Sequence, residues 1–246
     1  MGELSFYMQI SNNFQIAGLQ KTSLIDYPKK ISAILFTQGC NFRCRYCHNP
    51  ELIPFNQGMI FNITENDVLN FLKSRKHKIE ALCITGGEPL LQSGLKEFIQ
   101  KVKKMKYKVK LDTNGSNFEL LKNLIEEKLV DYIAMDYKAH FDLFGTITQV
   151  PESMFKEISK TKDYLINSKL KYEFRITILP KFFNDDDILK LAQELKGAKL
   201  VYLQNFHDNG KLLDESLAGE LGFTINKLKD FQKIMKKYVK KCGIRD

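Results

Sequence analysis

Residues 31–51 read ISAILFTQGCNFRCRYCHNPE, a short apolar segment that runs directly into a loop with three cysteines. The first seven residues are rich in Ile, Leu and Phe, which is typical of a strand buried on both faces. Parallel strands carry functional residues at their carboxyl ends, in barrels and in doubly wound sheets alike. This stretch therefore predicts both an α/β fold and the edge of the sheet where its site lies.

Segments of the same apolar kind recur along the chain, and segments with helical spacing separate them. The predicted strands are residues 31–37, 81–85, 108–113, 132–136, 172–179 and 199–204. Alternation of strands and helices predicts a parallel sheet with right-handed crossovers. Six repeats fit either a doubly wound sheet or a barrel left incomplete, and periodicity alone does not choose between them.

The predicted helices are identified by apolar residues that recur at i, i+3, i+4 and i+7, the spacing of one helix face. Three such stripes are Leu95/Phe98/Ile99/Val102, Leu120/Leu121/Leu124/Ile125 and Met154/Phe155/Ile158/Leu165/Ile166. A fourth helix is expected to open at Asp185, and a last one near Thr224, with Ile225, Leu228, Phe231, Met235 and Tyr238 on its apolar face. All these stripes are interpreted as core.

Length and composition bound the organisation of the chain. The 246 residues are 43% hydrophobic, which is enough for a sizeable core. We expect a single domain over residues 1–246, with a lead-in at 1–30, a core at 31–206, and a C-terminal loop and helix at 207–246. No apolar run approaches the roughly 18 residues of a membrane span, and no secretory signal is visible. A cytoplasmic protein without membrane contact is expected.

The charge of the chain is strongly basic but consists mostly of lysine. The formal net charge is +9, and five of the 38 basic residues are arginines. A protein that reads nucleic acid would use more arginine for bidentate contacts, so no nucleic-acid partner is expected. The lysine-rich stretch at 233–241 is interpreted as a solvated surface, with an acidic docking partner as the alternative.

Three of the five cysteines, Cys40, Cys44 and Cys47, lie within eight residues. In a reducing compartment this pattern favours metal binding over a disulfide framework. Cys83 lies in an apolar run and is interpreted as a small buried residue. Cys242 is interpreted as a thiol in the tail.

The cysteine loop allows three kinds of metal group. Cys44 to His48 form a C-x-x-C-H sequence, the attachment motif of a c-type haem, but Cys40 would then be superfluous. A structural zinc site needs four protein ligands, and His48 directly after Cys47 is awkwardly placed to be the fourth. A [4Fe–4S] cluster usually takes four thiolates, so three would leave one iron open. The spacing favours the iron–sulfur cluster, followed by zinc and then haem.

Polar residues follow nearly every predicted strand. They are Gly86-Gly87-Glu88-Pro89, Asp112-Thr113-Asn114-Gly115, Asp136-Tyr137-Lys138 and the run from Gln204 to Gly210, while Arg175 lies inside the fifth strand. A single site at one mouth of the sheet is the economical explanation. The two glycines allow a ligand to approach the backbone closely, and Glu88 offers a carboxylate to a cation, although a plain turn is the alternative. Beside an open iron, this pattern suggests an α-amino acid headgroup that chelates iron, as in S-adenosylmethionine.

Together these motifs resemble the radical S-adenosylmethionine (SAM) superfamily. Within it, GLQKTSLIDYP, TQGCNFRCRYCHNPEL, ITGGEPLLQ, LDTNGS, DYIAMDYKA and YEFRITILP are similar to the activating proteins of anaerobic ribonucleoside-triphosphate reductase. The resemblance runs from about Gly18 to His207 and implies an α/β fold of the incomplete (β/α)6 TIM-barrel type, which would settle the choice between sheet and barrel.

The resemblance also implies roles for individual residues. Cys40, Cys44 and Cys47 would hold one [4Fe–4S] cluster, whose fourth iron is chelated by the amino and carboxylate groups of SAM. Tyr46 would lie near the adenine, and Gly86, Gly87 and Glu88 would receive the methionine ammonium. Asp112, Thr113, Asn114, Asp136, Lys138, Arg175 and His207 match further cofactor positions, with Glu88, Asp136 and Lys138 assigned to catalysis. For Arg175 a structural ion pair is the alternative, and for His207 a surface histidine without a role.

The activity that the resemblance implies is reductive cleavage of SAM to a 5′-deoxyadenosyl radical, which removes a hydrogen from a glycine of a partner enzyme. The expected partner is a glycyl-radical enzyme, most specifically anaerobic ribonucleotide reductase, and the expected electron donor is a flavodoxin or a ferredoxin. One departure concerns that partner, because Asp26-Tyr27-Pro28-Lys29 stands where many activases have Asp-Gly-Pro-Gly. Alternatives are radical chemistry on another glycyl-radical enzyme, a peptide or a small molecule, and a non-catalytic metal-binding protein.

Overall fold

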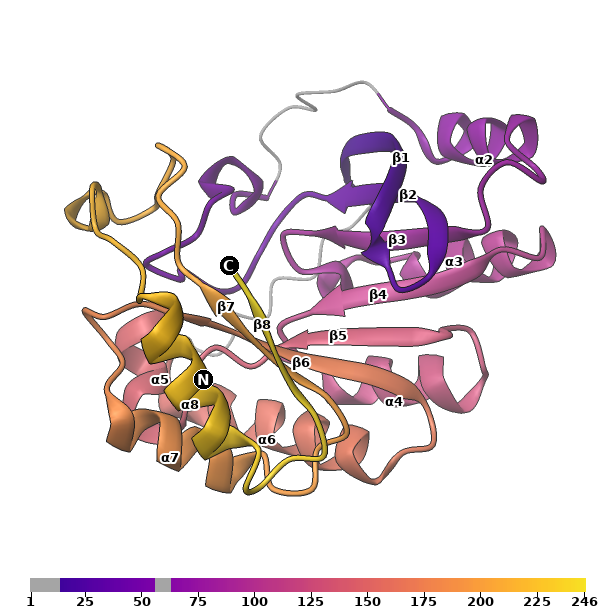
Figure 1. Cartoon of the computed structure of the whole chain (residues 1–246). Coiled ribbons are helices and arrows are strands. Elements are labelled where there is room, and N and C mark those ends of the chain that lie inside the picture. Colours follow the sequence, from indigo (N-terminus) through magenta and orange to yellow (C-terminus); the bar gives the residue numbers. More distant parts are fainter. Residues whose placement is uncertain (1–13, 56–62) are drawn as a thin grey trace. The chain divides into compact units, whose positions relative to one another are not determined.

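The structure is a computed structural model that describes residues 14–55 and 63–246 (Figure 1). Its contacts group the chain into two compact units, each built from several chain segments. The N-terminal unit contains residues up to 41, 51–113 and 117–133, and the C-terminal unit contains residues 42–50, 114–116 and 134–246. The expectation of one domain over residues 1–246 stays a prediction, and the first part of the lead-in lies outside the described residues.

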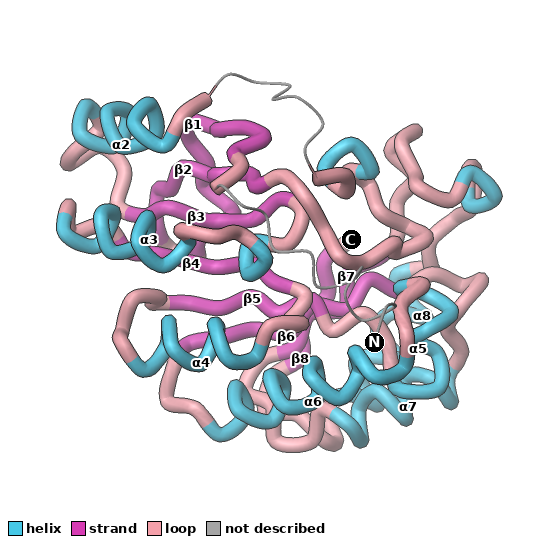
Figure 2. Tube along the Cα trace, turned by 180° about the vertical axis from the view of Figure 1, so that it is seen from behind, coloured by secondary structure: helices cyan, strands magenta, loops and turns pink. Residues whose placement is uncertain are grey.

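The N-terminal unit is built on four neighbouring strands in chain order: β1 (Ile16–Tyr27), β2 (Lys30–Thr37), β3 (Ala81–Gly86) and β4 (Lys108–Thr113). β1 pairs with β2 in the antiparallel sense, whereas β2, β3 and β4 are parallel. Helices α2 (Glu65–Ser74) and α3 (Leu95–Lys104) lie side by side (Figure 2), and α4 (Phe118–Glu126) follows β4. The pairing of Thr37 with Gly86 brings the carboxyl ends of β2 and β3 together.

The C-terminal unit is built on three parallel strands, β6 (Lys171–Ile178), β7 (Val201–Asn205) and β8 (Cys242–Arg245). Strand β5 (Tyr132–Asp136) begins in the N-terminal unit and ends in this one. The helices are α5 (Phe141–Thr148), α6 (Glu152–Asn167), α7 (Asp185–Glu194) and α8 (Ile225–Met235). Helices α7 and α8 lie side by side, and α8 also contacts β7 and β8.

The helices form where their predicted apolar stripes can be buried and their first turns capped. Leu95, Phe98, Ile99 and Val102 of α3 are all buried, and burying one such side chain contributes about 1.5–3 kcal/mol. Helix α7 begins with a capping box, in which the Asn184 side chain accepts from the Asp187 N–H and the Asp187 carboxylate accepts from the Asn184 N–H. This arrangement satisfies two of the N–H groups that a helix start leaves unpaired.

The alternation of strands and helices and the parallel pairing of β2–β4 and β6–β8 confirm the predicted α/β class. The sequence patterns missed β1, β8, α2 and α5. Three expectations near the C-terminus are wrong. Cys242 is not a tail thiol, because it is buried in β8, and Ile225 does not lie on the buried face of α8. Helix α8 also ends at Met235, before Tyr238.

No helix among the described residues has both the length and the apolar character needed to cross a membrane.

The packing of α8 can be tested with two substitutions in the same helix. Phe231 is fully buried, and its ring meets that of Phe223 edge-on at 4.9 Å between centroids. Phe231→Ala should therefore lower the free energy of unfolding by about 3–5 kcal/mol in urea denaturation. Ile225→Ala, at a side chain that is 45% exposed, should cost less than about 1 kcal/mol. Equal losses in the two variants would contradict the packing described here.

Candidate functional site

The loop that contains Cys40, Cys44 and Cys47 starts at the carboxyl end of β2. Its first residues form hydrogen bonds to residues 51–54, which follow the loop. The Gly39 N–H donates to the Leu52 carbonyl at 2.7 Å, and the Cys40 N–H donates to the Ile53 carbonyl at 2.9 Å. The Gln38 side-chain amide donates to two more carbonyls of this segment, those of Glu51 and Pro54, at 2.9 and 2.8 Å. The backbone leading into Cys40 is therefore fixed by hydrogen bonds within the N-terminal unit.

The glycine pair after β3 packs directly against this start of the loop. Gly87 N–H donates to the Thr37 carbonyl and Glu88 N–H donates to the Gly39 carbonyl, both at 2.8 Å. A Cβ on Gly86 would lie 2.3 Å from the Thr37 nitrogen, and Gly86 has a φ of +116°. A Cβ on Gly87 would lie 2.1 Å from the Gly39 carbonyl oxygen. The backbone of residues 37–39 fills the space beside these glycines. This packing by itself is enough to require glycine at both positions.

Glu88 points into the N-terminal unit and is almost completely buried. Its Oε1 accepts hydrogen bonds from Thr113 Oγ1 at 2.6 Å and from the Leu90 N–H at 3.0 Å. Because Thr113 ends β4, these contacts join the polar residues that follow β3 and β4. The structure thus brings Glu88 and Thr113, both predicted site residues, into direct contact.

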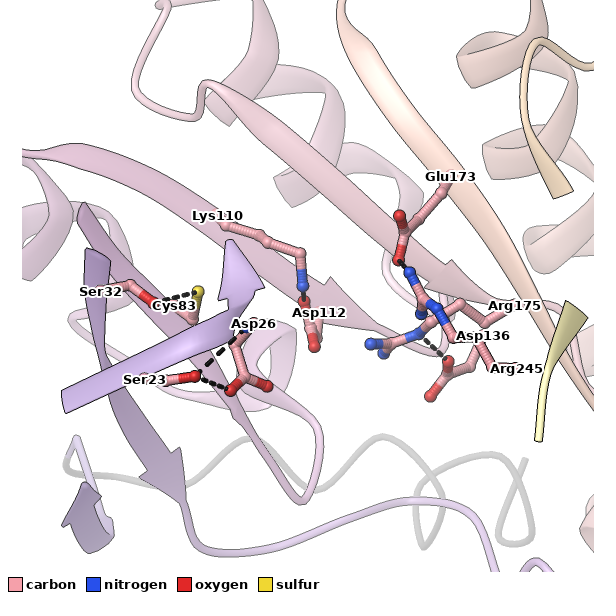
Figure 3. A network of polar contacts seen from close by, with 10 residues as sticks. All are labelled: Ser23, Asp26, Ser32, Cys83, Lys110, Asp112, Asp136, Glu173, Arg175 and Arg245. Atoms are coloured by element: carbon pink, nitrogen blue, oxygen red, sulfur yellow. Dashed lines mark hydrogen bonds and ion pairs between the residues drawn. The ribbon is translucent and has the colours of Figure 1, made fainter. Parts of the chain in front are cut away.

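Strand β4 carries a buried ion pair that the sequence analysis missed. Lys110 Nζ contacts a carboxylate oxygen of Asp112, and both side chains are buried (Figure 3). Alternate residues of a strand face the same side, so Lys110 lies on the face that carries the predicted site residue Asp112. The alternation of Lys108, Lys110 and Asp112 in KVKLDT was the signal that could have revealed this pair.

In the C-terminal unit, the cysteine loop covers the end of helix α5. The N–H groups of Arg43 and Arg45 donate to the carbonyls of Thr148 and Ile147, both at 3.0 Å. These carbonyls belong to the last turn of α5, where a helix leaves its acceptors unpaired. The Phe42 ring also meets the Phe144 ring edge-on, with 5.8 Å between centroids. The loop and α5 therefore stabilise each other.

Cys44 and Tyr46 are buried by this packing. Burial raises the pKa of the Cys44 thiol to about 12, although the nearby Lys138 cation acts in the opposite direction. A thiol with this pKa is protonated at neutral pH unless a metal ion replaces the proton. The Tyr46 hydroxyl and His48 Nδ1 are also buried and have no hydrogen-bond partner among the described residues. A buried thiol beside unpaired polar atoms fits a metal group with a polar ligand.

The end of β5 carries a carboxylate between two cations. Arg175 Nε lies 2.7 Å from Asp136 Oδ1 (Figure 3), and Lys138 Nζ lies 3.0 Å from Asp136 Oδ2. Burial acts to raise the pKa of Asp136, but Arg175 and Lys138 outweigh it and hold the pKa well below its usual range. Burial acts to lower the pKa of Lys138, yet Asp136 raises it above the ordinary value. Both groups therefore stay charged at neutral pH.

The other predicted site residues occupy different surroundings. Asn114 is buried, and its side-chain oxygen accepts from the Ser116 N–H at 2.9 Å, which closes a tight turn. The His207 side chain is 65% exposed, and its Nε2 lies 3.4 Å from a carboxylate oxygen of Asp246. The ion pair suggested as an alternative for Arg175 is present, and His207 lies on the surface.

The three clustered cysteines belong to both units, since Cys40 lies in the N-terminal unit and Cys44 and Cys47 lie in the C-terminal unit. None of the five cysteines forms a disulfide within the part of the chain that the structure describes. Over the described ranges 14–55 and 63–246, no group of three or more His, Cys, Asp or Glu side chains is arranged to hold a single metal ion.

Comparison with known proteins relates this geometry to a family. Residues 34–195 match the Radical SAM superfamily. A protein of Methanocaldococcus jannaschii with the name "Putative glycyl-radical enzyme activating enzyme" is 34% identical over 235 residues, which cover 94% of this chain and 95% of the relative. A GTP 3′,8-cyclase of Campylobacter jejuni is 31% identical over 206 residues, which cover 77% of this chain and 62% of the relative.

Solved structures show the same fold at low sequence identity. Streptococcus suis SuiB bound to S-adenosylmethionine matches with a TM-score of 0.64 and 14% identity, over 85% of this chain and 48% of SuiB. The enzyme anSMEcpe with bound S-adenosylmethionine matches with a TM-score of 0.57 and 15% identity, over 81% of this chain and 57% of that enzyme. The chain thus spans about half the length of these two structures.

The family match and these structures confirm the predicted fold, an α/β partial barrel with parallel strands. The family match also confirms the predicted cofactors, because radical SAM enzymes use a [4Fe–4S] cluster and S-adenosylmethionine. With a family match over residues 34–195 and a 34% identical relative along nearly its whole length, this chain belongs to the radical SAM superfamily of enzymes.

Proposed function

We propose that this enzyme is an activase that generates a glycyl radical on a partner enzyme. The observation that carries the proposal is the similarity to the M. jannaschii protein, which is named for this activity and matches over 95% of its length. A second M. jannaschii protein of the same name is 29% identical over 175 residues. Within this class, the motifs listed in the sequence analysis favour anaerobic ribonucleoside-triphosphate reductase as the partner.

Cys40, Cys44 and Cys47 are proposed to hold the one [4Fe–4S] cluster. When bound, the cluster and S-adenosylmethionine supply a one-electron cleavage of the sulfonium that yields a 5′-deoxyadenosyl radical. The donor set supports this assignment, because three thiols lie within eight residues of one loop and Cys44 is buried where the loop packs on α5. The electron would come from a flavodoxin or a ferredoxin.

The chain's own residues are proposed to bind and orient S-adenosylmethionine. Glu88, with Gly86 and Gly87 shaping the turn before it, would receive the methionine ammonium. The Glu88 carboxylate is suited to this because the Thr113 hydroxyl and the Leu90 N–H hold Oε1 in place. Fixing the carboxylate in advance reduces the ordering that binding would otherwise require.

The charged group at the end of β5 is proposed to act at the other end of the cofactor. Asp136 and Lys138 would orient polar groups of S-adenosylmethionine, and Arg175 would keep Asp136 in position. The ion pairs at 2.7 and 3.0 Å support this arrangement, since they keep Asp136 and Lys138 charged. Tyr46 would lie at the adenine, where its unpaired hydroxyl can find a partner. Asp112, Asn114 and His207 are retained as further cofactor-contacting candidates.

The departure at Tyr27 has an explanation inside the N-terminal unit. Tyr27 is buried in a cluster with Ile34, Ala81, Cys83 and Tyr132, and its ring centroid lies 6.0 Å from that of Tyr132. The side chain fills core space where many activases have glycine. Core packing therefore explains why tyrosine stands at position 27 in place of glycine. The substitution gives no reason to reject a glycyl-radical enzyme as the partner.

A second candidate function follows from the GTP 3′,8-cyclase relatives, which are radical enzymes of the same superfamily with a small-molecule substrate. The C. jejuni protein is 31% identical over 77% of this chain. Under this alternative the residues that bind S-adenosylmethionine would be the same, and only the acceptor of the radical would differ. The two candidates are therefore separated by their products.

The partner can be identified by electron paramagnetic resonance. The anaerobically reconstituted enzyme, with S-adenosylmethionine, a reductant and candidate ribonucleotide reductase, should produce the doublet of a glycyl radical on the reductase. A reductase whose target glycine is replaced by alanine should give no doublet, because a side chain blocks access to the α-hydrogen. If the doublet never forms while GTP is converted to a cyclised product, the small-molecule alternative holds.

The cluster assignment can be tested with two buried cysteines. Cys44→Ala should lose the brown absorbance and nearly all iron after anaerobic reconstitution, and it should not cleave S-adenosylmethionine, because only two loop thiolates remain. Cys83→Ala is the matched control, since Cys83 is also buried but lies in β3 beside Ser32. It should keep both iron and cleavage. Cleavage by Cys44→Ala would refute the proposed cluster site.

The role of Glu88 can be tested by removing its charge while keeping its shape. Glu88→Gln should weaken S-adenosylmethionine binding by about tenfold or more, because a hydrogen bond to a charged group contributes about 1.5–3 kcal/mol. Iron content should stay unchanged. Equilibrium dialysis of the reconstituted variants would measure the affinity, with Glu97→Gln on the exposed face of α3 as the control. Equal affinities of the two variants would count against the assignment.

A further inference from the structure

A segment near the C-terminus forms a second backbone contact with the cysteine loop. Residues 213–216, here called the strap, run beside the loop within the C-terminal unit. The Leu213 N–H donates to the Cys47 carbonyl at 3.1 Å, and the Asp214 N–H donates to the Arg45 carbonyl at 3.0 Å. The loop is thus hydrogen-bonded to α5 through the N–H groups of Arg43 and Arg45, and to the strap through the carbonyls of Arg45 and Cys47.

A side-chain contact strengthens this pairing. Arg45 Nε lies 2.5 Å from Asp214 Oδ2, and the two side chains are only 25% and 22% exposed. The Arg45 guanidinium carbon also lies 5.0 Å from the centroid of the Phe182 ring. Asp214 is oriented in turn by the Ser216 N–H, which donates to its Oδ1 at 3.0 Å. Arg45 is therefore fixed from two sides, at a position between Cys44 and Cys47.

The strap is also held by a residue outside the loop. Lys181 Nζ donates to the Ser216 carbonyl at 3.0 Å and lies 3.1 Å from a carboxylate oxygen of Glu220. Next to the loop and the strap is an open pocket of about 630 Å³, lined by Arg43, Arg45, Thr146, Gln149, Leu213, Asp214, Glu215 and Ser216. Solvent therefore reaches Arg43 and Arg45 of the loop, and the strap hydrogen-bonds to the backbone at Cys47.

The strap lies beyond the part of the chain that matches the superfamily, which ends at residue 195. We propose that Arg45 and Asp214 are positioning residues, which hold the Cys44–Cys47 part of the loop in the geometry that binds the cluster and limit the access of solvent to Cys47. The proposal rests on the assignment of the three cysteines to the cluster and does not depend on which partner receives the radical. The strap acts on the cofactor only through the loop.

The first test measures the loop itself, in the full chain without iron. Asp214→Asn removes the charge and keeps an oxygen that can accept from the Ser216 N–H. Cys47 should then react with iodoacetamide about threefold to fivefold faster, as expected from losing one partly buried ion pair. Cys242 in β8 is the internal reference, and its unchanged rate would show that the fold is intact. Asp230→Asn, which removes an exposed ion pair with Lys233 on α8, is the matched control.

The second test measures the loaded protein, without S-adenosylmethionine or partner. Asp214→Asn should shift the midpoint potential of the cluster and speed its bleaching in air, whereas Asp230→Asn should do neither. Asp214→Glu, which restores the charge, should recover much of the original potential. The proposal would be overturned if Cys47 reacted with iodoacetamide at the same rate in Asp214→Asn and in Asp230→Asn. It would also be overturned if Cys47 reacted faster in Asp214→Asn while the midpoint potential of the cluster stayed unchanged. Failure of the unsubstituted protein to take up iron would instead refute the cysteine assignment.

Discussion

The structure depends on the close packing of two backbone segments, residues 37–39 at the end of β2 and residues 86–88 at the end of β3. Two hydrogen bonds of 2.8 Å join the segments, and neither Gly86 nor Gly87 has room for a Cβ. This contact has two consequences, one for each of the two segments. It fixes the chain immediately before Cys40, and it directs Glu88 inward to the Thr113 hydroxyl. A larger residue at either glycine would disturb both together.

Electrostatics organises the C-terminal unit as backbone packing organises the N-terminal one. Asp136 would be unfavourable as a partly buried carboxylate, but Arg175 and Lys138 lie within 3.0 Å of it and keep it ionised. Lys138 also influences the buried thiol of Cys44. Glu173 is another buried carboxylate, and it lies on β6 like Arg175. It pairs with Arg245 of β8 (Figure 3). Strand β8 thus brings the last residues of the chain into the charged network of β6.

Family membership and specific function rest on different observations. Membership of the radical SAM superfamily follows from the match over residues 34–195 and from the 34% identical relative. The partner is proposed from that relative's name and from short motifs, and cyclase relatives at 31% identity share much of the same chain. The strap at 213–216 lies outside residues 34–195, the part of the chain that matches the superfamily.

The sequence by itself determined the strand–helix alternation, the cysteine spacing and the polar residues at the strand ends, because these depend on local periodicity and on the chemistry of single residues. It also identified the buried stripe of α3, whose spacing alone defines a helix face. It could not show that Gly86 and Gly87 pack against backbone, that Tyr27 fills core space, or that Cys242 is buried in a strand. Nor could it pair Arg45 with Asp214, 169 positions further along the chain. These features were decided only by the tertiary structure, since each depends on contacts between segments distant in sequence, and no local pattern specifies which distant segment will lie alongside.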